Sequence, residues 1–296
     1  MDGVHGEGRQ EDGTLYVVAT PIGNLDDITL RALKVLAAAD VIAAEDTRTT
    51  ATLLTRHGIG GRPVALHRHN ESRMAAQVLL WLREGRSVAL VSDAGTPGLS
   101  DPGAPVVAKA RAAGMRVVPV PGANAAVAAF SASGLPDGRF LFYGFLPARA
   151  SARRAAIAGL AELNCALVFY EAPHRILDSV DDLVAALPGE RTIVIARELT
   201  KVFESIASMP LQGAPAWMRA EANRQRGEFV LIVSGAPEKD GKAPTGWETT
   251  LAHLLVELPL AQAVRLTCAL TGARRKAVYE HALAAVAAVA MAKEKE

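Results

Sequence analysis

One segment of the chain, Ser92–Gly103 (SDAGTPGLSDPG), combines side chains that can bind a polar ligand with residues that free the backbone for unusual conformations. Its twelve residues include three glycines, two prolines and two aspartates, and they follow an apolar run that is typical of a buried strand. An ordinary turn of this length needs no such density of special backbone positions. We therefore expect the backbone to wrap a ligand while Asp93 or Thr96 binds its polar edge. An elaborate structural turn is the alternative.

Two further loops also begin where apolar runs end. Thr20–Leu25 (TPIGNL) contains Pro21, which lacks a backbone donor, and Gly23, which allows another group to approach closely. Pro121–Ser133 (PGANAAVAAFSAS) opens a helix with small side chains, which would let that helix approach a cofactor or a second domain. Thr20–Leu25 does not match G-x-G-x-x-G and carries no P-loop lysine, so it lacks both nucleotide-binding fingerprints. Taken alone, Thr20–Leu25 is also typical of an ordinary turn, and simple tight packing is the alternative for Pro121–Ser133.

These loops require strands whose ends lie close together. In the first half of the chain, runs that are apolar on both faces alternate with alanine-rich helical stretches, which indicates a parallel sheet covered by helices on both sides. Ligands collect at the carboxyl ends of such strands. The expected strands are Leu15–Ala19, Val41–Ala44, Val64–Leu66, Val88–Ser92 and Val117–Val120, and the expected helices are Asp26–Ala39, Glu71–Arg83 and Ala104–Ala113.

A second α/β layer is expected beyond Gly134–Leu146, where turn residues precede an apolar run. Its expected strands are Leu141–Phe145, Ala166–Tyr170, Thr192–Ala196 and Phe229–Val233, and its expected helices are Ala150–Leu163, Arg175–Leu187 and Leu211–Asn223. We therefore predict an α/β protein with a disordered leader at 1–13, α/β domains at 14–134 and 135–236, a linker at 237–247, and a small helical module at 248–296.

The composition limits the class of protein. A length of 296 residues with 50% hydrophobic content predicts about two domains with a large core. A formal charge of +1 excludes coating of nucleic acid by bulk electrostatics but leaves room for local basic patches. Cys165 and Cys268 form no Cys-x-x-Cys pair, which argues against a disulfide scaffold and a cysteine zinc site. The sequence contains neither a signal peptide nor a membrane span, so the cytoplasm is the expected compartment.

In the order and wording of its loops, the chain resembles the ribosomal RNA small subunit methyltransferase I family, a branch of the tetrapyrrole-methylase superfamily of S-adenosylmethionine (SAM) enzymes. The matching segments are TPIGNL, AEDTR (Ala44–Arg48), SDAGTPGLSDPG, PGANAA, FYEAPHR (Phe169–Arg175) and ARELTK (Ala196–Lys201). The resemblance implies two α/β domains with SAM in the cleft between them, and a homodimer. It also implies 2′-O-methylation of a cytidine in the decoding centre of 16S ribosomal RNA (rRNA), with the small ribosomal subunit as partner. A small-molecule methylase and a non-catalytic RNA-binding protein on the same fold are the alternatives.

The resemblance assigns SAM to the loops of the first domain and to a closing edge from the second. The residues that it implies for cofactor binding are Pro21, Gly23, Asp93, Ala94, Gly95, Thr96, Pro121, Gly122, Ala123, Asn124, Ala125, Tyr170, Glu171, Gly227, Glu228 and Phe229. The reaction requires no metal, and His67 and His69 lack a nearby third ligand. We therefore expect no metal site.

Methyl transfer to a ribose oxygen depends on alignment, and on a base or a cation that makes the hydroxyl a better nucleophile. Charged residues after strands are the candidates, namely Glu45, Asp46, Arg48, Glu71 and Lys201. Asp46 is also a good helix N-cap, so a structural role is its alternative. The sequence singles out no general base.

Contacts with rRNA need cations near the cleft rather than a basic chain. The candidates are His69, Asn70, Arg149, Arg153, Arg154, His174, Arg175, Arg197, Arg274, Arg275 and Lys276. The last three follow Thr271-Gly272 in a helix pair that resembles a helix-turn-helix. A solvated helix face is the alternative for any one arginine, and an ion pair with Glu198 is the alternative for Arg197.

Overall fold

The computed structural model describes residues 13–136, 138–237 and 247–293. These residues form two compact units, the first ending at Gly235 and the second beginning at Ala236. Apart from their end residues, the predicted leader at 1–13 and the predicted linker at 237–247 lie outside the described residues. No helix within the described ranges is long and apolar enough to cross a membrane.

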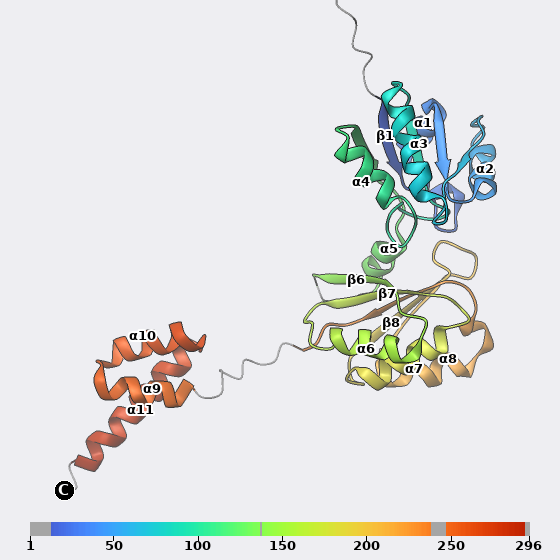
Figure 1. Cartoon of the computed structure of the whole chain (residues 1–296). Coiled ribbons are helices and arrows are strands. Elements are labelled where there is room, and N and C mark those ends of the chain that lie inside the picture. Colours follow the sequence, from blue (N-terminus) through green and yellow to red (C-terminus); the bar gives the residue numbers. More distant parts are fainter. Residues whose placement is uncertain (1–12, 137, 238–246, 294–296) are drawn as a thin grey trace, which may run out of the picture. The chain divides into compact units, whose positions relative to one another are not determined.

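The first sheet, which contains β1 and lies among helices α1 to α4 in Figure 1, is parallel throughout, as the sequence predicts. Its strand order is β3-β2-β4-β1-β5. Its strands are β1 (Thr14–Val18), β2 (Val41–Ala44), β3 (Val64–Ala65), β4 (Val88–Val91) and β5 (Arg116–Val120). Every residue of β2 and β4 is buried, because helices cover both faces of the sheet. Leu15, Val88 and Leu90 face one helical layer, whereas Val18, Ala89 and Val91 face the other.

The helices that cover this sheet are α1 (Leu30–Ala38), α2 (Thr47–Arg56), α3 (Glu71–Arg83) and α4 (Ala104–Ala112). The predicted single helix Asp26–Ala39 is wrong at its start. The chain forms a 3-10 turn at Leu25–Asp27, then Ile28 is extended, and Thr29 caps α1 by accepting a hydrogen bond from the Ala32 amide at 3.1 Å. Helix α2 is not among the expected helices, although the sequence offers Asp46 as a helix N-cap. Asp46 begins it by accepting from the Arg48 amide at 2.8 Å.

The second sheet is mixed, with the strand order β6-β7-β10-β8-β9, and β10 runs antiparallel to both of its neighbours. Its strands are β6 (Phe140–Phe145), β7 (Ala166–Glu171), β8 (Thr192–Arg197), β9 (Ser205–Pro210) and β10 (Phe229–Val233). One face packs on α6 (Ala150–Leu160), α7 (Ile176–Ala186) and α8 (Ala214–Ala220). The sequence missed β9 and predicted too long a helix at Leu211–Asn223, of which α8 is the central part.

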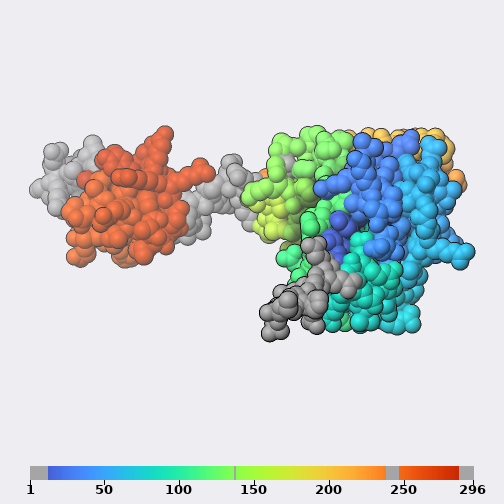
Figure 2. Space-filling view, turned by 90° about the horizontal axis from the view of Figure 1, so that it is seen from above, coloured from blue at the N-terminus to red at the C-terminus, as the bar shows by residue number. Residues whose placement is uncertain are grey.

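The other face of the second sheet packs on α5 (Ala125–Ser131), which precedes β6 in the chain. Ala126 and Ala129 of α5 lie in one buried cluster with Val168 and Val230 of the sheet, and their small side chains permit this close packing. In the space-filling view, the blue and cyan surface of the first layers adjoins the green surface of the second (Figure 2). The loop that starts α5 therefore lies between the two sheets.

The second unit consists of α9 (Trp247–Glu257), α10 (Leu260–Thr271) and α11 (Arg275–Lys293). Trp247, Leu251, Val264 and Val278 are buried in its core. Gly272 ends α10 in the left-handed conformation with φ of 72°, which a glycine adopts without steric cost and which lets the chain turn into α11. The predicted helix pair is confirmed, with Gly272 between its members and Thr271 as the last residue of α10.

Candidate active site

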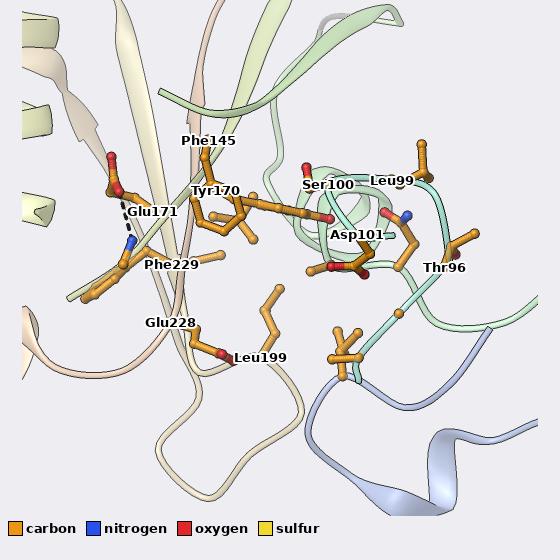
Figure 3. Close-up of a pocket in the computed structure, with 18 of the residues that line it drawn as sticks. Thr96, Leu99, Ser100, Asp101, Phe145, Tyr170, Glu171, Leu199, Glu228 and Phe229 are labelled. Carbon is orange, nitrogen blue, oxygen red and sulfur yellow. Dashed lines mark hydrogen bonds between the residues drawn. The ribbon is translucent and has the colours of Figure 1, made fainter. Parts of the chain in front are cut away.

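Loops from both sheets of the first unit enclose a cavity of about 280 Å³ (Figure 3). Sequence-predicted cofactor residues that line it are Ala94, Gly95, Thr96, Asn124, Ala125, Tyr170, Glu171, Glu228 and Phe229. Predicted cofactor residues that do not line it in the described structure are Pro21, Gly23, Asp93, Pro121, Gly122, Ala123 and Gly227. Lining residues that the sequence analysis did not name as site residues include Ile22, Leu99, Ser100, Asp101, Phe145 and Leu199. The apolar ones look like core residues in sequence, but Asp101 lies inside the unusual glycine-rich loop and that loop could have pointed to it.

Hydrogen bonds tie the three predicted loops together at the ends of β1, β4 and β5. Thr20 and Gly95 exchange backbone hydrogen bonds at 2.9 and 3.0 Å, and the Thr96 hydroxyl donates to the Ala123 carbonyl at 3.3 Å. Gly95 has a φ of +85°, a region that other residues rarely adopt. The glycines and prolines of these loops therefore allow the backbones of three loops to meet at the ends of β1, β4 and β5.

The far end of the Ser92–Gly103 loop is held by residues that follow β3. The Gly103 amide donates to Oε1 of Glu71 at 2.5 Å, and Arg68 Nη2 donates to the Ser100 carbonyl. Asn70 is also committed, because its side chain bonds to the backbone of its own loop. In this structure the side chains of Glu71 and Asn70 therefore form hydrogen bonds with backbone groups. Glu71 is a predicted catalytic candidate, and Asn70 is a predicted RNA contact.

Four carboxylates gather beside the cavity on the first-sheet side. Asp46 forms an ion pair with Arg48 at 2.7 Å, and hydrogen bonds from the Arg48 side chain and amide lower the pKa of Asp46 to about 2. Asp93 accepts from the Asp46 amide at 2.8 Å. Burial, together with the charge of Asp93, raises the pKa of Glu45. Burial, with the charge of Glu45, raises the pKa of Asp101 to about 6. Asp46 is also the N-cap of α2, which matches the structural alternative given for it.

Two residues of β7 face the cavity in different ways. The Tyr170 hydroxyl accepts from the Ala126 amide at 3.1 Å, which joins the second sheet to the start of α5, and burial raises the pKa of this tyrosine. The Glu171 carboxylate points away from the cavity, where it accepts from the Ser179 hydroxyl at 2.5 Å and lies 3.3 Å from Arg175 Nε (Figure 3). The Glu171 carboxylate therefore forms structural contacts with Ser179 and Arg175, and only the rest of the residue lines the cavity.

The loop after β8 closes the cavity from the opposite side. The Asn24 amide donates to the Thr200 hydroxyl at 3.0 Å, so this loop touches the Thr20–Leu25 loop. Lys201 lies between Glu198 at 2.9 Å and Glu228 at 2.8 Å. Partial burial disfavours the charge of Lys201, but the hydrogen bonds to Glu228 and Glu198 outweigh it and raise its pKa. Lys201 is thus an ion-paired cation at the rim.

The predicted basic strips divide into structural and accessible residues. The expectation that Arg153 belongs to an accessible basic strip is wrong, because its side chain is 4% exposed and forms a buried ion pair with Asp182 at 2.6 Å. Arg175 donates to the Leu146 carbonyl, and Arg197 donates to the carbonyls of Phe203, Asn223 and Arg226 rather than pairing with Glu198. Arg153 is therefore buried, whereas the half-buried Arg175 and Arg197 bind backbone carbonyl groups in this structure. The predicted contacts that remain exposed are His69, Arg149, Arg154, His174, Arg274, Arg275 and Lys276.

Among the side chains that the structure describes, no three His, Cys, Asp or Glu residues gather as a metal site. The site is therefore a two-sided cavity with apolar walls, small residues at the strand ends and a carboxylate, Asp101, inside it.

Two family models match the sequence. One, described as Tetrapyrrole (Corrin/Porphyrin) Methylases, covers residues 14–215, and the other, described as RsmI C-terminal HTH domain, covers residues 243–285. The two matches together reach both the α/β unit and the C-terminal helices.

Known proteins agree with these models. The chain is 49% identical to the ribosomal RNA small subunit methyltransferase I of Escherichia coli over 94% of this chain and 98% of that protein. It is 49% identical to the protein of the same name from Pseudomonas aeruginosa, over 92% and 97% of the two chains. A solved structure of uroporphyrin-III C-methyl transferase from Thermus thermophilus, complexed with S-adenyl homocysteine, has a TM-score of 0.53 at 19% identity and covers 75% of this chain and 97% of that one. This last likeness shows the fold.

Proposed function

Because the chain belongs to the tetrapyrrole methylase family and matches ribosomal RNA small subunit methyltransferases I along almost its whole length, we propose that it methylates 16S rRNA with SAM as methyl donor. The finer proposal is that the acceptor is the ribose 2′ oxygen of a cytidine in the decoding centre. One observation carries the proposal of rRNA methylation, namely that the match includes both the α/β unit and the C-terminal helices. The finer assignment to the ribose 2′ oxygen of a cytidine is supported by the resemblance of the loop motifs. The likeness to tetrapyrrole enzymes covers 75% of the chain at 19% identity.

The residues of the cavity fit such a cofactor. Ile22, Leu99 and Leu199 give an apolar lining suited to an adenine ring, while Thr96 and Asp101 offer polar groups to a hydrophilic end. Small residues at the strand ends leave room for a ligand beside the backbone. When bound, SAM supplies an electrophilic methyl group whose sulfide leaves without protonation.

The chain's own residues must align the acceptor oxygen with that methyl group and remove its proton. Alignment alone supplies a large part of the rate, and the loops around the cavity are fixed for it by the bonds of Thr20, Glu71 and Thr200 described above. The exposed cations Arg149 and Arg154 and the basic start of α11 are the proposed contacts for rRNA phosphates.

We also propose that the enzyme acts in the cytoplasm, on the small ribosomal subunit, as a homodimer. The resemblance supports these assignments, and sedimentation of the purified protein at several concentrations measures the oligomeric state. A sedimentation coefficient that stays at the monomer value at all concentrations contradicts the homodimer.

Labelled SAM tests the proposed function directly. The full-length protein is incubated with small subunits from a strain that lacks this gene, with free rRNA, or with a porphyrinoid precursor. We expect label on one nucleoside of the rRNA, identified by mass spectrometry as 2′-O-methylcytidine. Label on a base, or on the porphyrinoid only, overturns the proposal.

A bulky residue inside the cavity provides the matching loss-of-function variant. Thr96→Trp fills the cavity and should abolish SAM binding in calorimetry, whereas Thr55→Trp, at an exposed position of α2, should leave binding unchanged. Equal SAM affinity of the two variants contradicts the placement of the cofactor.

A further inference from the structure

Phe145 is an aromatic side chain of the cavity to which none of the roles above is assigned. It ends strand β6 and is 49% exposed, whereas Phe229, the other phenylalanine of the lining, is 3% exposed. Figure 3 shows Phe145 beside Tyr170 and away from Leu199, which belongs to the lining suited to an adenine ring. A side chain that lines a cavity and keeps half of its surface exposed lies at the opening of that cavity.

A β-bulge in β6 turns Phe145 toward the cavity. The register of β6 against β7 shifts between Phe142 and Gly144, so Tyr143 is an extra residue in β6. In a regular strand, residues three apart face opposite sides of the sheet. Here Phe142 and Phe145 both contact the Tyr170 ring, at centroid distances of 4.8 and 5.7 Å. Bulges are rare between parallel strands, and next to active sites they re-aim a side chain.

The neighbours of Phe145 hold its ring in this position. Gly144 has a φ of +81°, and a Cβ there would lie 2.8 Å from the Ser100 hydroxyl, so the glycine lets β6 approach the Ser92–Gly103 loop closely. The rings of Phe145 and Tyr170 meet at an angle of 68°, and Tyr170 is itself fixed by the hydrogen bond from the Ala126 amide. Phe145 therefore presents a ring of fixed orientation with part of its surface free.

A free aromatic surface at the opening of this cavity suits a nucleobase. A ribose that enters the cavity brings its base to the opening, and that base must first leave its stack in the RNA. Proteins that bind unstacked RNA bases hold them on aromatic side chains. Such stacking accepts every base, because every base has a π face. The ring of Phe145 can therefore replace a stacking partner that the target base loses.

We propose that the Phe145 ring stacks on the base of the target nucleotide and so positions its ribose at the cavity, an assignment that rests on the proposed function. The stacking offsets part of the cost of taking the base out of the RNA stack. A phenylalanine side chain forms no hydrogen bond with a base edge. Phe145 therefore contributes to affinity and position, and the choice of the nucleotide belongs to other contacts.

The test compares two variants of the full-length protein, Phe145→Leu, which keeps an apolar side chain without a ring, and Phe145→Tyr, which keeps the ring. With saturating SAM and unmodified small subunits, kcat/KM for the subunits should fall roughly 10-fold or more in Phe145→Leu and stay within about threefold of the wild type in Phe145→Tyr. SAM affinity measured by calorimetry should be unchanged in both. Tyr143→Leu is the matched control and should keep the wild-type kcat/KM, because Tyr143 is a partly exposed residue of the same strand that packs on Phe169 at the other face of the sheet.

A second measurement removes the base instead of the ring. Small subunits are reconstituted with an rRNA that lacks only the base of the target nucleotide, and kcat/KM is measured for the wild type and for Phe145→Leu. The wild type should lose roughly 10-fold on these subunits, whereas Phe145→Leu should lose less than about threefold, because its stacking contact is already absent. A residue that only shapes the cavity gives two independent losses that multiply.

The outcomes distinguish this assignment from the proposed function. If the wild type methylates rRNA and Phe145→Leu keeps its kcat/KM within about threefold, the assignment is overturned and the function stands. Loss of SAM affinity in proportion to the loss of kcat/KM would make Phe145 a cofactor contact and also overturn it. Equal losses in Phe145→Tyr and Phe145→Leu, or losses that multiply when the base is removed, overturn it as well. A wild type that does not methylate rRNA overturns the proposed function itself.

Discussion

Replacing Arg153 with methionine should destabilise the α/β unit and leave rRNA binding intact, although the sequence places this arginine in a basic strip. Its Nε donates to Oδ2 of Asp182 at 2.6 Å, and the two side chains are 4% and 10% exposed. Nη1 also donates to the Ala148 carbonyl at 3.4 Å. Arg154 approaches the other oxygen of Asp182 at 3.4 Å from a side chain that is 56% exposed.

The magnitude follows from the burial of both partners. Two unit charges 2.6 Å apart attract by roughly 6 kcal/mol at an effective dielectric of about 20, and the desolvation of both groups offsets most of that gain. Removing one partner of a buried pair costs about 3–5 kcal/mol, because the other charge stays buried. Arg154 retains part of the interaction, so we expect a loss of about 3 kcal/mol, or roughly 6–12 °C in Tm for a unit of this size.

Denaturant and thermal unfolding of the full chain measure the loss, with filter binding to small subunits in parallel. Arg153→Met combined with Asp182→Leu should recover much of the stability, since a hydrophobic pair can replace a buried ion pair. Arg154→Met should change the free energy of unfolding by less than about 1 kcal/mol. An Arg153→Met variant with unchanged stability and weakened rRNA binding would refute the structural role and restore the role predicted from the sequence.

Three further predictions concern other parts of the chain. Asp101→Asn should raise the free energy of unfolding by about 1 kcal/mol at pH 8. The rise in the pKa of Asp101 from 3.8 to about 6 corresponds to about 3 kcal/mol, and solvent screening at this partly exposed site reduces that value. The raised pKa means that stability is lost as pH rises through that range, so the gain should vanish near pH 3.8. Gly227→Ala should lower Tm, because φ is +90° and the new Cβ would lie 2.5 Å from Glu198 Cγ, with a cost of about 2 kcal/mol or more. Alanines at Arg274–Lys276 should weaken rRNA binding and reduce its salt slope by about one per cation in contact, with unchanged SAM affinity.

Each of these has a result that contradicts it. A gain from Asp101→Asn that is equal at pH 4 and pH 8 would show that its pKa is not raised. Gly213→Ala is the control for Gly227→Ala, because nothing lies within 4 Å of its added Cβ, and equal melting of the two variants would show that the strained site tolerates a side chain. A salt slope of rRNA binding that is the same with and without the alanines at Arg274–Lys276 would exclude α11 from the interface.

Much of the fold follows from patterns that are local in sequence. Helix α3 and strand β10 begin and end where periodicity predicts them, because both are bounded by polar or turn residues. Strand β9 escaped prediction, since it is an edge strand that contains two serines and ends in a proline, with every second side chain exposed. The composition of the Ser92–Gly103 loop also predicts an unusual backbone. A loop that bonds to two other loops needs glycines and prolines that few ordinary turns contain.

The site was less predictable, because the role of a side chain depends on distant partners. Arg153 looks like a surface cation, and only Asp182 in the next helix decides that it is buried. Leu199 and Phe145 line the cavity, yet their residue types are those of an ordinary core. For the same reason the composition of the glycine-rich loop indicates a site that includes Asp101, but the charges of Glu45 and Arg68 near its carboxylate come from distant parts of the chain.

The position of α5 has a consequence for the order in which the protein is made. This helix leaves the ribosome just after the first sheet, but one of the strands on which it packs, β10, is among the last parts of the α/β unit to be synthesised. Until then Ala126 and Ala129 lack part of their packing, and the cavity lacks the lining residues Glu228, Phe229 and Val230. A nascent chain can therefore complete its first sheet early. It gains a closed cofactor cavity only when the second sheet is finished, so fragments released before Phe229 should carry the glycine-rich loop without retaining SAM.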